Sequence, residues 1–298
     1  MEVLSHGGRR IKHRLDRLDE DTPRRWFLFV TTVSPCQFRN LSRISLVKAN
    51  LGDVFMDALV LSIRACTGIR YLRLAENKFS ETHAGQIADI VARNPCLDKL
   101  LLPDNYLHDG GACAVTVCLP ATVTVLNLDM NCLEGRAGSS FVGNLHVLVS
   151  LKNLSVAFND LDPLFLKDLF SQGLNLSSLT YLSLSDNERI ADQGLELISA
   201  ALVRLCSLQS LVLSRCGISG RGALSFMEIL PPGHTLTHLY FYENVDIGFE
   251  VHRLREMFQQ RVPPMRFYYP VSGDAPFSEE GDDHPLFQPV VFYEDEER

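Results

Sequence analysis

Residues 179–187 read LTYLSLSDN, and residues 151–159 read LKNLSVAFN. Both stretches carry apolar residues at the first, fourth and sixth positions and asparagine at the ninth. The same spacing recurs elsewhere, with cysteine or alanine in the ninth position of two copies: 41–49, 69–77, 97–105, 123–131, 208–216 and 236–244. Successive copies begin 28, 28, 26, 28, 28, 29 and 28 residues apart. A period of this length predicts a solenoid of about eight stacked units.

Each part of the unit has a physical role. The apolar alternation predicts a short strand with one buried face. The asparagine satisfies backbone groups where the strand turns away, since a buried unpaired amide costs about 1–3 kcal/mol. Ala49 cannot do this, so we expect a looser first turn or one served by Asn50. Apolar residues spaced three and four apart then predict an outer helix, as in 195–202.

This pattern resembles the leucine-rich-repeat family, and a period near 28 is similar to its ribonuclease-inhibitor-like class. The resemblance covers about residues 41–264. It implies an α/β solenoid that is curved, with a parallel sheet on the concave face and helices on the convex face. We expect three regions: an N-terminal segment and cap (1–40), the solenoid (41–264), and a C-terminal cap strand with an acidic tail (265–298).

Solenoids need capped ends. Aromatic residues around Trp26, in a stretch of helical character from 15 to 40, are expected to cover the first repeat. At the other end, Phe267 and Tyr268 are expected in a last irregular strand. The tail from Asp274 to Arg298 holds nine acids and one base, which accounts for the whole formal charge of −8. Its acids and prolines predict disorder in isolation.

The charge distribution does not support nucleic-acid binding, because proteins that bind nucleic acids normally have a basic surface. The bases between Arg9 and Arg25 are interleaved with acids, which favours a solvated segment. The first 25 residues lack an apolar signal core, and the run from Trp26 to Val33 is too short to span a bilayer. We therefore expect a cytoplasmic protein without membrane attachment. A cytosolic chain of this size has no need of disulfides, and its eight cysteines form no CxxC pair.

Catalytic motifs are missing from the sequence. It contains no GxxxxGK[ST], GxSxG or HExxH pattern and no paired metal-ligand spacing. We therefore expect no enzyme activity, no cofactor and no metal. Cys132 and Cys216 fall at the strand-exit turns, where core packing explains them better than reactivity.

The residues between the buried strand positions should face the concave side. This lining is basic near the N-terminal end, small and polar in the middle, and aromatic near the C-terminal end. Tyrosine and arginine are enriched in binding hot spots. The predicted partner-binding residues are Arg43, Tyr71, Arg73, Lys99, Asp129, Tyr181, His238, Tyr240 and Tyr242. The alternative is that these are ordinary exposed strand residues.

The leading hypothesis is an interaction scaffold that binds a protein partner in the concave face. Similar proteins include inhibitors, innate-immune sensor domains and components of cilia and flagella, so a fixed subunit of a ciliary or flagellar complex is one expectation, with association to the cytoskeleton or cilium. The alternative is a regulator of a small GTPase, because Ran GTPase-activating proteins have similar repeats and an acidic tail. We expect a monomer. The acidic tail also permits self-masking, in which it folds back on Arg43, Arg73 and Lys99.

Overall fold

The computed structural model describes residues 2–5, 10–12, 41–47, 63, 66–135, 141–171, 176–231, 233–244, 250–259 and 266–268. The expected aromatic cap around Trp26, the first turn at Ala49 and Asn50, and the tail from Asp274 lie outside these residues. The predictions for these three segments therefore stay predictions.

The strands form a single sheet of 11 members in the order β11-β10-β9-β8-β7-β6-β5-β4-β3-β1-β2. From β3 to β11, each strand pairs in parallel with the next. These parallel strands are β3 (Leu41–Val47), β4 (Tyr71–Ala75), β5 (Lys99–Leu101), β6 (Val125–Asn127), β7 (Asn153–Ser155), β8 (Tyr181–Ser183), β9 (Ser210–Val212), β10 (His238–Tyr240) and β11 (Arg266–Tyr268). The predicted parallel solenoid is confirmed, and β11 lies where the sequence predicts a last strand.

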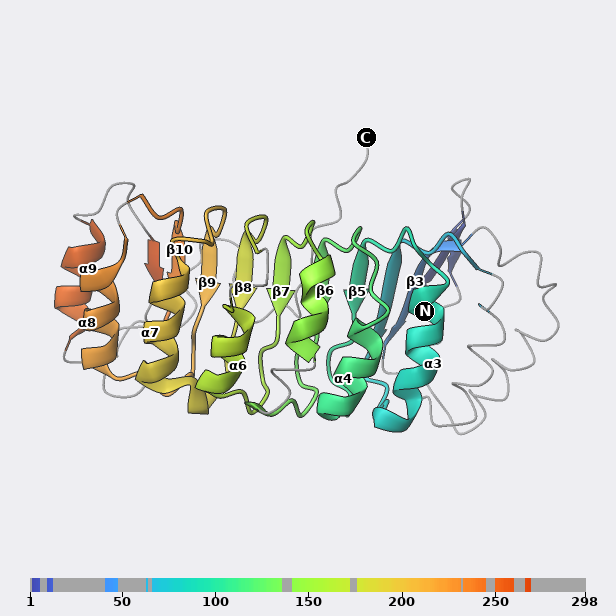
Figure 1. Cartoon of the computed structure of the whole chain (residues 1–298), viewed down its shortest axis with the longest axis horizontal. Coiled ribbons are helices and arrows are strands. Elements are labelled where there is room, and N and C mark those ends of the chain that lie inside the picture. Colours follow the sequence, from blue (N-terminus) through green and yellow to red (C-terminus); the bar gives the residue numbers. More distant parts are fainter. Residues whose placement is uncertain are drawn as a thin grey trace.

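Helices form a second row that covers one side of the sheet (Figure 1). The helical elements are α3 (Glu81–Ala92), α4 (His108–Thr116), the 3-10 helix η3 (Val142–Val147), α6 (Pro163–Leu169), the 3-10 turn η4 (Glu188–Ile190), α7 (Ala191–Ala201), α8 (Gly220–Ile229) and α9 (Val251–Gln259). Side chains cap some of their starts: Asp162 accepts a bond from Leu164 N at 2.9 Å ahead of α6, where Pro163 pre-sets the backbone. Among the described residues, no helix is long and apolar enough to cross a membrane.

The core is a continuous stack of the consensus apolar residues. Successive strands each contribute a central leucine with no exposed surface: Leu72, Leu100, Leu126, Leu154, Leu182, Leu211 and Leu239. Helix residues such as Phe165 and Phe226 close the stack from the other side. Because each unit packs mainly against its two neighbours, the core extends along the whole array rather than around one centre.

The predicted asparagine ladder is present. Asn159 donates through Nδ2 to Leu128 O at 3.1 Å in the preceding repeat and to Val156 O at 3.0 Å in its own repeat. Its Oδ1 accepts from Asn131 N at 2.9 Å and Leu133 N at 3.0 Å. Equivalent donor bonds to the preceding repeat are made by Asn77, Asn105, Asn131, Asn187 and Asn244. In the seventh copy the Cys216 thiol donates to Leu184 O, 3.2 Å away.

The N-terminal segment contains two strands that the sequence does not predict. Strand β1 (Glu2–Ser5) pairs antiparallel with β3, and β2 (Arg10–Lys12) pairs antiparallel with β1. The basic stretch therefore contains an edge strand at residues 10–12, and the prediction that this stretch is solvated stays a prediction. These strands continue the sheet beyond β3, whose edge is otherwise open to unwanted pairing. These strands are short and have no periodic pattern, and β1 pairs with a strand far away in the sequence. The local sequence therefore contains no pattern that predicts them.

Candidate functional site

The side of the sheet away from the helices carries the predicted binding residues. We call it the strand face, meaning the side chains of β3 to β10, and of the residue after each strand, that alternate with the buried leucines. The strand register places equivalent residues side by side. One row of neighbours across the sheet is Arg43, Tyr71, Lys99, Val125, Asn153, Tyr181, Ser210 and His238.

Four of the predicted residues come together at the N-terminal end of the strand face. Arg43, Tyr71, Arg73 and Lys99 lie on adjacent strands β3 to β5, and all are partly exposed. The guanidinium carbon of Arg43 lies 3.9 Å from the centroid of the Tyr71 ring, a cation–π contact. We call these four residues the basic patch.

The centre of the strand face holds a carboxylate in a hydrogen-bond network. Asp129 Oδ1 accepts from Ser155 Oγ at 2.6 Å and from Ala157 N at 2.7 Å, and Oδ2 accepts from Asn127 Nδ2 at 2.8 Å. Burial raises the pKa of Asp129, and these hydrogen bonds only partly oppose that shift. Burial, followed by the negative charge of Asp129, raises the pKa of Tyr181 to about 12.

Small polar residues form the floor of the strand face between β7 and β9. Ser155, Ser183, Ser185 and Ser214 are all nearly fully buried, the last two at 2% and 1% exposure. The hydroxyls of Ser185 and Ser214 have no hydrogen-bond partner, and neither has Oδ2 of Asp186. Buried polar groups are usually hydrogen-bonded, so three unpartnered atoms at adjacent positions require an explanation. We call these four serines the serine floor.

At the C-terminal end, the rings of Tyr240 and Tyr242 stack with centroids 6.4 Å apart. Tyr242 and His238 are partly exposed, but Tyr240 is only 7% exposed. Tyr240 thus contributes mainly to packing on the strand face. The alternation pattern does not predict this, because it indicates which face a side chain lies on and not how much of that side chain its neighbours bury. The structure therefore places the predicted residues in three groups: the basic patch, a centre with Asp129 and Tyr181, and an aromatic end on β10.

A further row of residues, which sequence reasoning missed, follows the strands at their exit. Each member precedes the ladder position by one residue and has a positive φ between 51° and 57°: Glu76, Asp104, Met130, Phe158, Asp186, Arg215 and Glu243. We call this row the strand-exit row. Met130 and Phe158 are each 45% exposed, although both are large and apolar. The left-handed conformation normally favours glycine or asparagine, so the residue types at these positions do not predict it.

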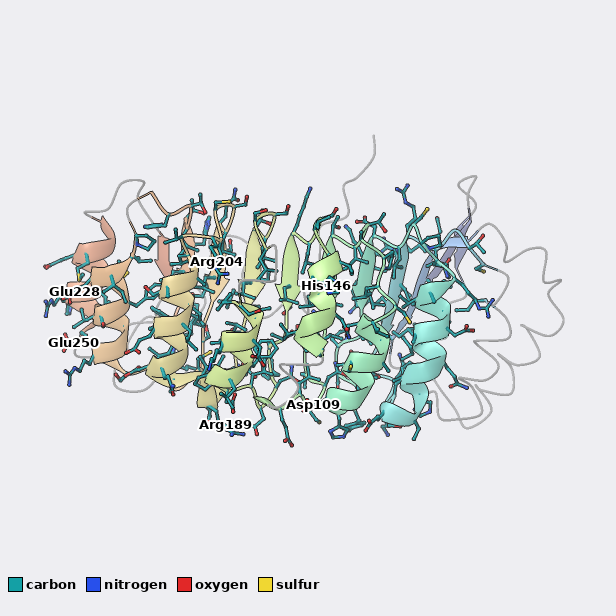
Figure 2. The ribbon with its side chains drawn as sticks, in the orientation of Figure 1. Asp109, His146, Arg189, Arg204, Glu228 and Glu250 are labelled. Carbon is teal, nitrogen blue, oxygen red and sulfur yellow. The ribbon has the colours of Figure 1, made fainter. Side chains whose placement is uncertain are left out.

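The strand-exit row contains a bridged set of charges. Arg215 donates through Nε to Asp186 and through Nη1 to Glu243 Oε2, the latter at 2.9 Å. One repeat earlier, Arg189 pairs with Asp160 at 2.8 Å. Figure 2 shows Arg189 and Asp109 along the same edge of the molecule, where strands end and helices begin. Cys132 is exposed at this edge, so the expectation that it packs in the core is wrong, whereas Cys216 is buried as expected.

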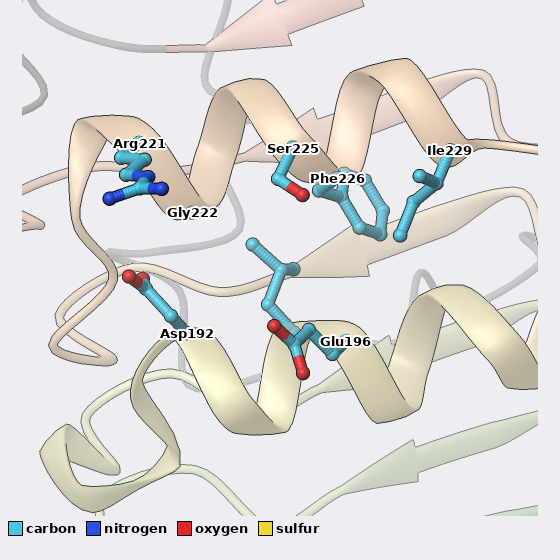
Figure 3. A pocket seen from close by; sticks show the side chains of 8 residues that line it. Asp192, Glu196, Arg221, Gly222, Ser225, Phe226 and Ile229 are labelled. Atoms are coloured by element: carbon cyan, nitrogen blue, oxygen red, sulfur yellow. The ribbon is translucent and has the colours of Figure 1, made fainter.

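The helical side has a hollow between α7 and α8, with a volume of about 360 Å³. Asp192 and Arg221 lie at one end and Ile229 at the other (Figure 3). Asp192 is already committed to the start of α8, because it accepts bonds from Ser219 N at 2.8 Å and Ser219 Oγ at 2.6 Å. The buried Leu195 and Phe226 beneath the hollow belong to the core. This hollow is therefore explained by helix packing.

Comparison with known proteins agrees with this architecture. A family model described as Leucine Rich repeat matches residues 175–199 and 204–227. Over 68 residues the chain is 43% identical to human "NACHT, LRR and PYD domains-containing protein 5". That match covers 22% of this chain and 6% of the human protein, so this chain corresponds to a small part of it.

Two solved structures are similar in fold. The leucine-rich repeat-containing protein LegL7 from Legionella pneumophila superposes with a TM-score of 0.56 and 16% identity, over 89% of this chain and 79% of LegL7. A chain of the yeast Rad7 and Elc1 complex superposes with a TM-score of 0.50 and 16% identity, over 72% of this chain and 57% of that one. At this identity the likeness shows a shared fold alone.

Proposed function

Because the chain is a leucine-rich-repeat protein, we propose that it binds a protein partner through the strand face. The observation that supports this most directly is the basic patch. A stacked Arg43–Tyr71 pair beside Arg73 and Lys99 combines the residue types that dominate binding energy at protein interfaces. A chain of similar fold occurs in the yeast structure described as a complex of Rad7 and Elc1, which supports the view that this fold can take part in protein complexes.

The basic patch sets the chemistry of the partner surface that it contacts. Three cations on neighbouring strands favour an acidic surface, and Tyr71 supplies an aromatic anchor within it. Loss of a charge at the rim of an interface mainly slows association, whereas loss of a buried anchor speeds dissociation. The two kinds of substitution should therefore be separable by kinetics.

The test is affinity capture from native lysate with a charge-reversal variant, Arg73→Glu with Lys99→Glu, against a matched control. The control is Lys167→Glu with Arg221→Glu, which reverses two exposed charges on the helices α6 and α8. We expect a partner that the wild type and the control retain and the strand-face variant loses. If all three proteins capture the same partners, binding occurs elsewhere and the proposal is wrong.

The alternative function, regulation of a small GTPase, makes a different prediction. A regulator of this type has to place a polar group next to the nucleotide of the GTPase. The two arginines described at the strand-exit edge, Arg189 and Arg215, are both held in ion pairs. We expect no acceleration of GTP hydrolysis by Ran when this chain is added in catalytic amounts, and an acceleration would replace the scaffold proposal.

A further inference from the structure

Two exposed apolar residues, Met130 and Phe158, occupy equivalent positions of adjacent repeats in the strand-exit row. Each is 45% exposed, and Met130 N donates to the O atom of Ala157, the residue before Phe158, at 2.9 Å. The other members of the row are all charged: Glu76, Asp104, Asp186, Arg215 and Glu243. The fold therefore accepts a charged side chain at this position and does not need an apolar one. In the part of the chain that the structure describes, no other exposed large apolar residues share a position in adjacent repeats.

Tyr106 enlarges this apolar surface on the preceding repeat, where it is 48% exposed. It follows Asn105, whose backbone N–H donates to Met130 O at 3.0 Å, so the chain at Tyr106 runs next to Met130. We call Tyr106, Met130 and Phe158 the exit patch. Soluble proteins seldom gather exposed apolar side chains without a use, and such patches mark interaction sites. Tyrosine, methionine and phenylalanine are also enriched in the cores of protein interfaces.

The loops that carry the exit patch are acidic. Residues 104–109, 129–134 and 158–162 hold six acids and neither lysine nor arginine. Glu134 and Asp160 lie side by side, because they form an isolated parallel bridge between neighbouring repeats. Complementary charge steers association and excludes like-charged partners. The surroundings of the exit patch therefore favour a cationic partner and disfavour an acidic one.

A hollow of about 280 Å³ lies beside Phe158. Its lining residues are Asn159, Asp160, Asp186, Glu188, Arg189 and Arg215. The guanidinium carbon of Arg215 lies 5.5 Å from the centroid of the Phe158 ring, so this ring borders the hollow. Each arginine of the lining is held between two carboxylates, and the exposed Glu188 belongs to neither set. Three carboxylates of the lining and two more that pair with its arginines thus stand against two guanidinium groups, which leaves negative charge for a further cation.

We propose that the exit patch and this hollow form a second docking surface, which binds a positively charged segment of a protein partner that also carries apolar side chains. The apolar side chains pack on Met130 and Phe158. A lysine or arginine beside them lies in the hollow against Asp160 and Glu188. This inference goes beyond the proposed function, because the surface lies outside the basic patch and has the opposite charge.

The first experiment uses three capped peptides: KLKKLK, which combines charge with apolar side chains, KSKKSK, which keeps only the charge, and ELEELE, which reverses the charge. Binding is followed by the backbone amide signals of Asn131 and Asn159, the neighbours of Met130 and Phe158, in ¹H–¹⁵N spectra of the full chain. These signals report the site itself and not peptide bound by the acids of residues 274–298. We expect KLKKLK to shift both signals with an affinity at least ~10-fold above those of the other two peptides. Equal affinity of KSKKSK or ELEELE, or no shift at these amides, overturns the proposal.

The second experiment removes the apolar side chains of the exit patch. Met130→Ser with Phe158→Ser should weaken the binding of KLKKLK several-fold. The matched control is Leu164→Ser with Val203→Ser, which removes two apolar residues of 57% and 72% exposure, in α6 and after α7. This control should bind the peptide as the wild type does. Equal losses in the two variants, or no loss in the first, contradict the role of the exit patch.

The third experiment removes charge and leaves the exit patch intact. Glu134→Gln with Glu188→Gln changes two exposed side chains, so the fold should be retained. We expect several-fold weaker binding of KLKKLK and a smaller effect of added salt on the affinity. Glu196→Gln with Glu228→Gln, on α7 and α8, removes two exposed carboxylates elsewhere and is the matched control. An unchanged affinity in the first variant overturns the placement of a cation in the hollow.

Two further outcomes distinguish this inference from its alternatives. The wild type should sediment as a monomer, and a dimer that Met130→Ser with Phe158→Ser abolishes would place a second copy of the chain on the exit patch and overturn the assignment to a partner. If capture depends on Arg73 and Lys99 while KLKKLK does not bind at the exit patch, the proposed function stands and this inference fails. If KLKKLK binds there and capture ignores the basic patch, this inference stands and the proposed function fails.

Discussion

The guanidinium carbon of Arg215 lies 5.5 Å from the centroid of the Phe158 ring, although two repeats separate these residues in the sequence. Between them lies Asp186, which accepts a hydrogen bond from Arg215. One guanidinium thereby lies over a partly exposed ring and neutralises a carboxylate whose side chain is only 13% exposed. The contact joins three repeats along the strand-exit row.

We expect Arg215→Ala to lower the free energy of unfolding by about 1–2 kcal/mol, because it leaves a largely buried carboxylate without its cation. Denaturant unfolding measures this. The matched control is Arg253→Ala, which removes an ion pair of 3.4 Å between two exposed side chains and should cost about 0.5 kcal/mol or less. Equal losses in the two variants contradict the bridging role of Arg215.

Asn159→Ala should be more damaging and should cost about 2–4 kcal/mol, because the bonds of the side chain to its own repeat and to the preceding repeat are all lost. Its amide donates to carbonyls of its own and of the preceding repeat, and its oxygen accepts from two backbone amides of that preceding repeat. Asn153→Ala, on the strand face of the same repeat, is the control. Hydrogen exchange should show the loss of protection at Asn131 N and Leu133 N first. Unchanged protection there argues against the ladder as the source of stability.

The raised pKa of Asp129 predicts a pH dependence with a definite sign. A carboxyl whose pKa is higher in the folded state than in the unfolded state takes up its proton more readily when folded. Its contribution to stability therefore improves as the pH falls through the folded pKa and levels off below the unfolded value, near pH 4. At neutral pH the buried charge costs stability.

Comparison of the wild type with Asp129→Asn measures this effect, because Asp109 and Asp186, which also have raised pKa values, are present in both proteins. In the variant, the new side-chain amide lies next to the donor Nδ2 of Asn127. This contact changes the free energy of unfolding by an amount that does not depend on pH. The stability of the variant relative to the wild type should be greatest at neutral pH and decline toward about pH 4. A difference that does not change with pH, or that grows on acidification, refutes the assignment.

Thiol reactivity should separate the exposed from the buried cysteines among the described residues, with Cys113 and Cys118 of intermediate exposure between them. Cys96, Cys132 and Cys206 are exposed, whereas Cys66 and Cys216 are buried. Burial raises the pKa of Cys66 to about 11 and also raises that of Cys216, so both lack thiolate at neutral pH. Brief alkylation of the native protein followed by mass spectrometry should label Cys96, Cys132 and Cys206 and leave Cys66 and Cys216 unlabelled. Early labelling of Cys216 contradicts its place in the ladder.

Removal of the tail provides a test of self-masking. Residues 274–298 hold nine acids and one base, and the basic patch has the opposite charge. If the tail competes for the patch, its deletion should raise the affinity for the partner, and added salt should reduce the difference between full-length and truncated chains. An unchanged affinity removes the hypothesis.

The sequence predicts the parts of this structure that repeat. Each consensus leucine and each ladder asparagine acts within a unit or on the next one, so its role follows from its position in the period. That reasoning places Leu154 in the core and Asn159 in the ladder, and it places the predicted binding residues on one face by alternation alone.

The sequence does not predict features that depend on how the side chains of neighbouring repeats pack together. The burial of Tyr240 depends on its neighbours across the sheet, and the exposure of Met130 and Phe158 depends on a left-handed backbone that propensity disfavours. The unpartnered hydroxyls of the serine floor are visible only once Ser185 and Ser214 are known to be neighbours. Strand β1 pairs with β3, which is far away in the sequence, so no local sequence pattern predicts β1 and β2.

The ladder has a consequence for how such a protein changes through evolution. Because its bonds join each repeat only to the adjacent ones, duplication or loss of one unit between β5 and β7 leaves the residues of the basic patch and of the serine floor in place. The only change is in their separation, by one strand spacing of about 4.8 Å. The distance between the two regions is therefore inherited in discrete steps, and a change in the number of repeats alters this distance without redesign of either region.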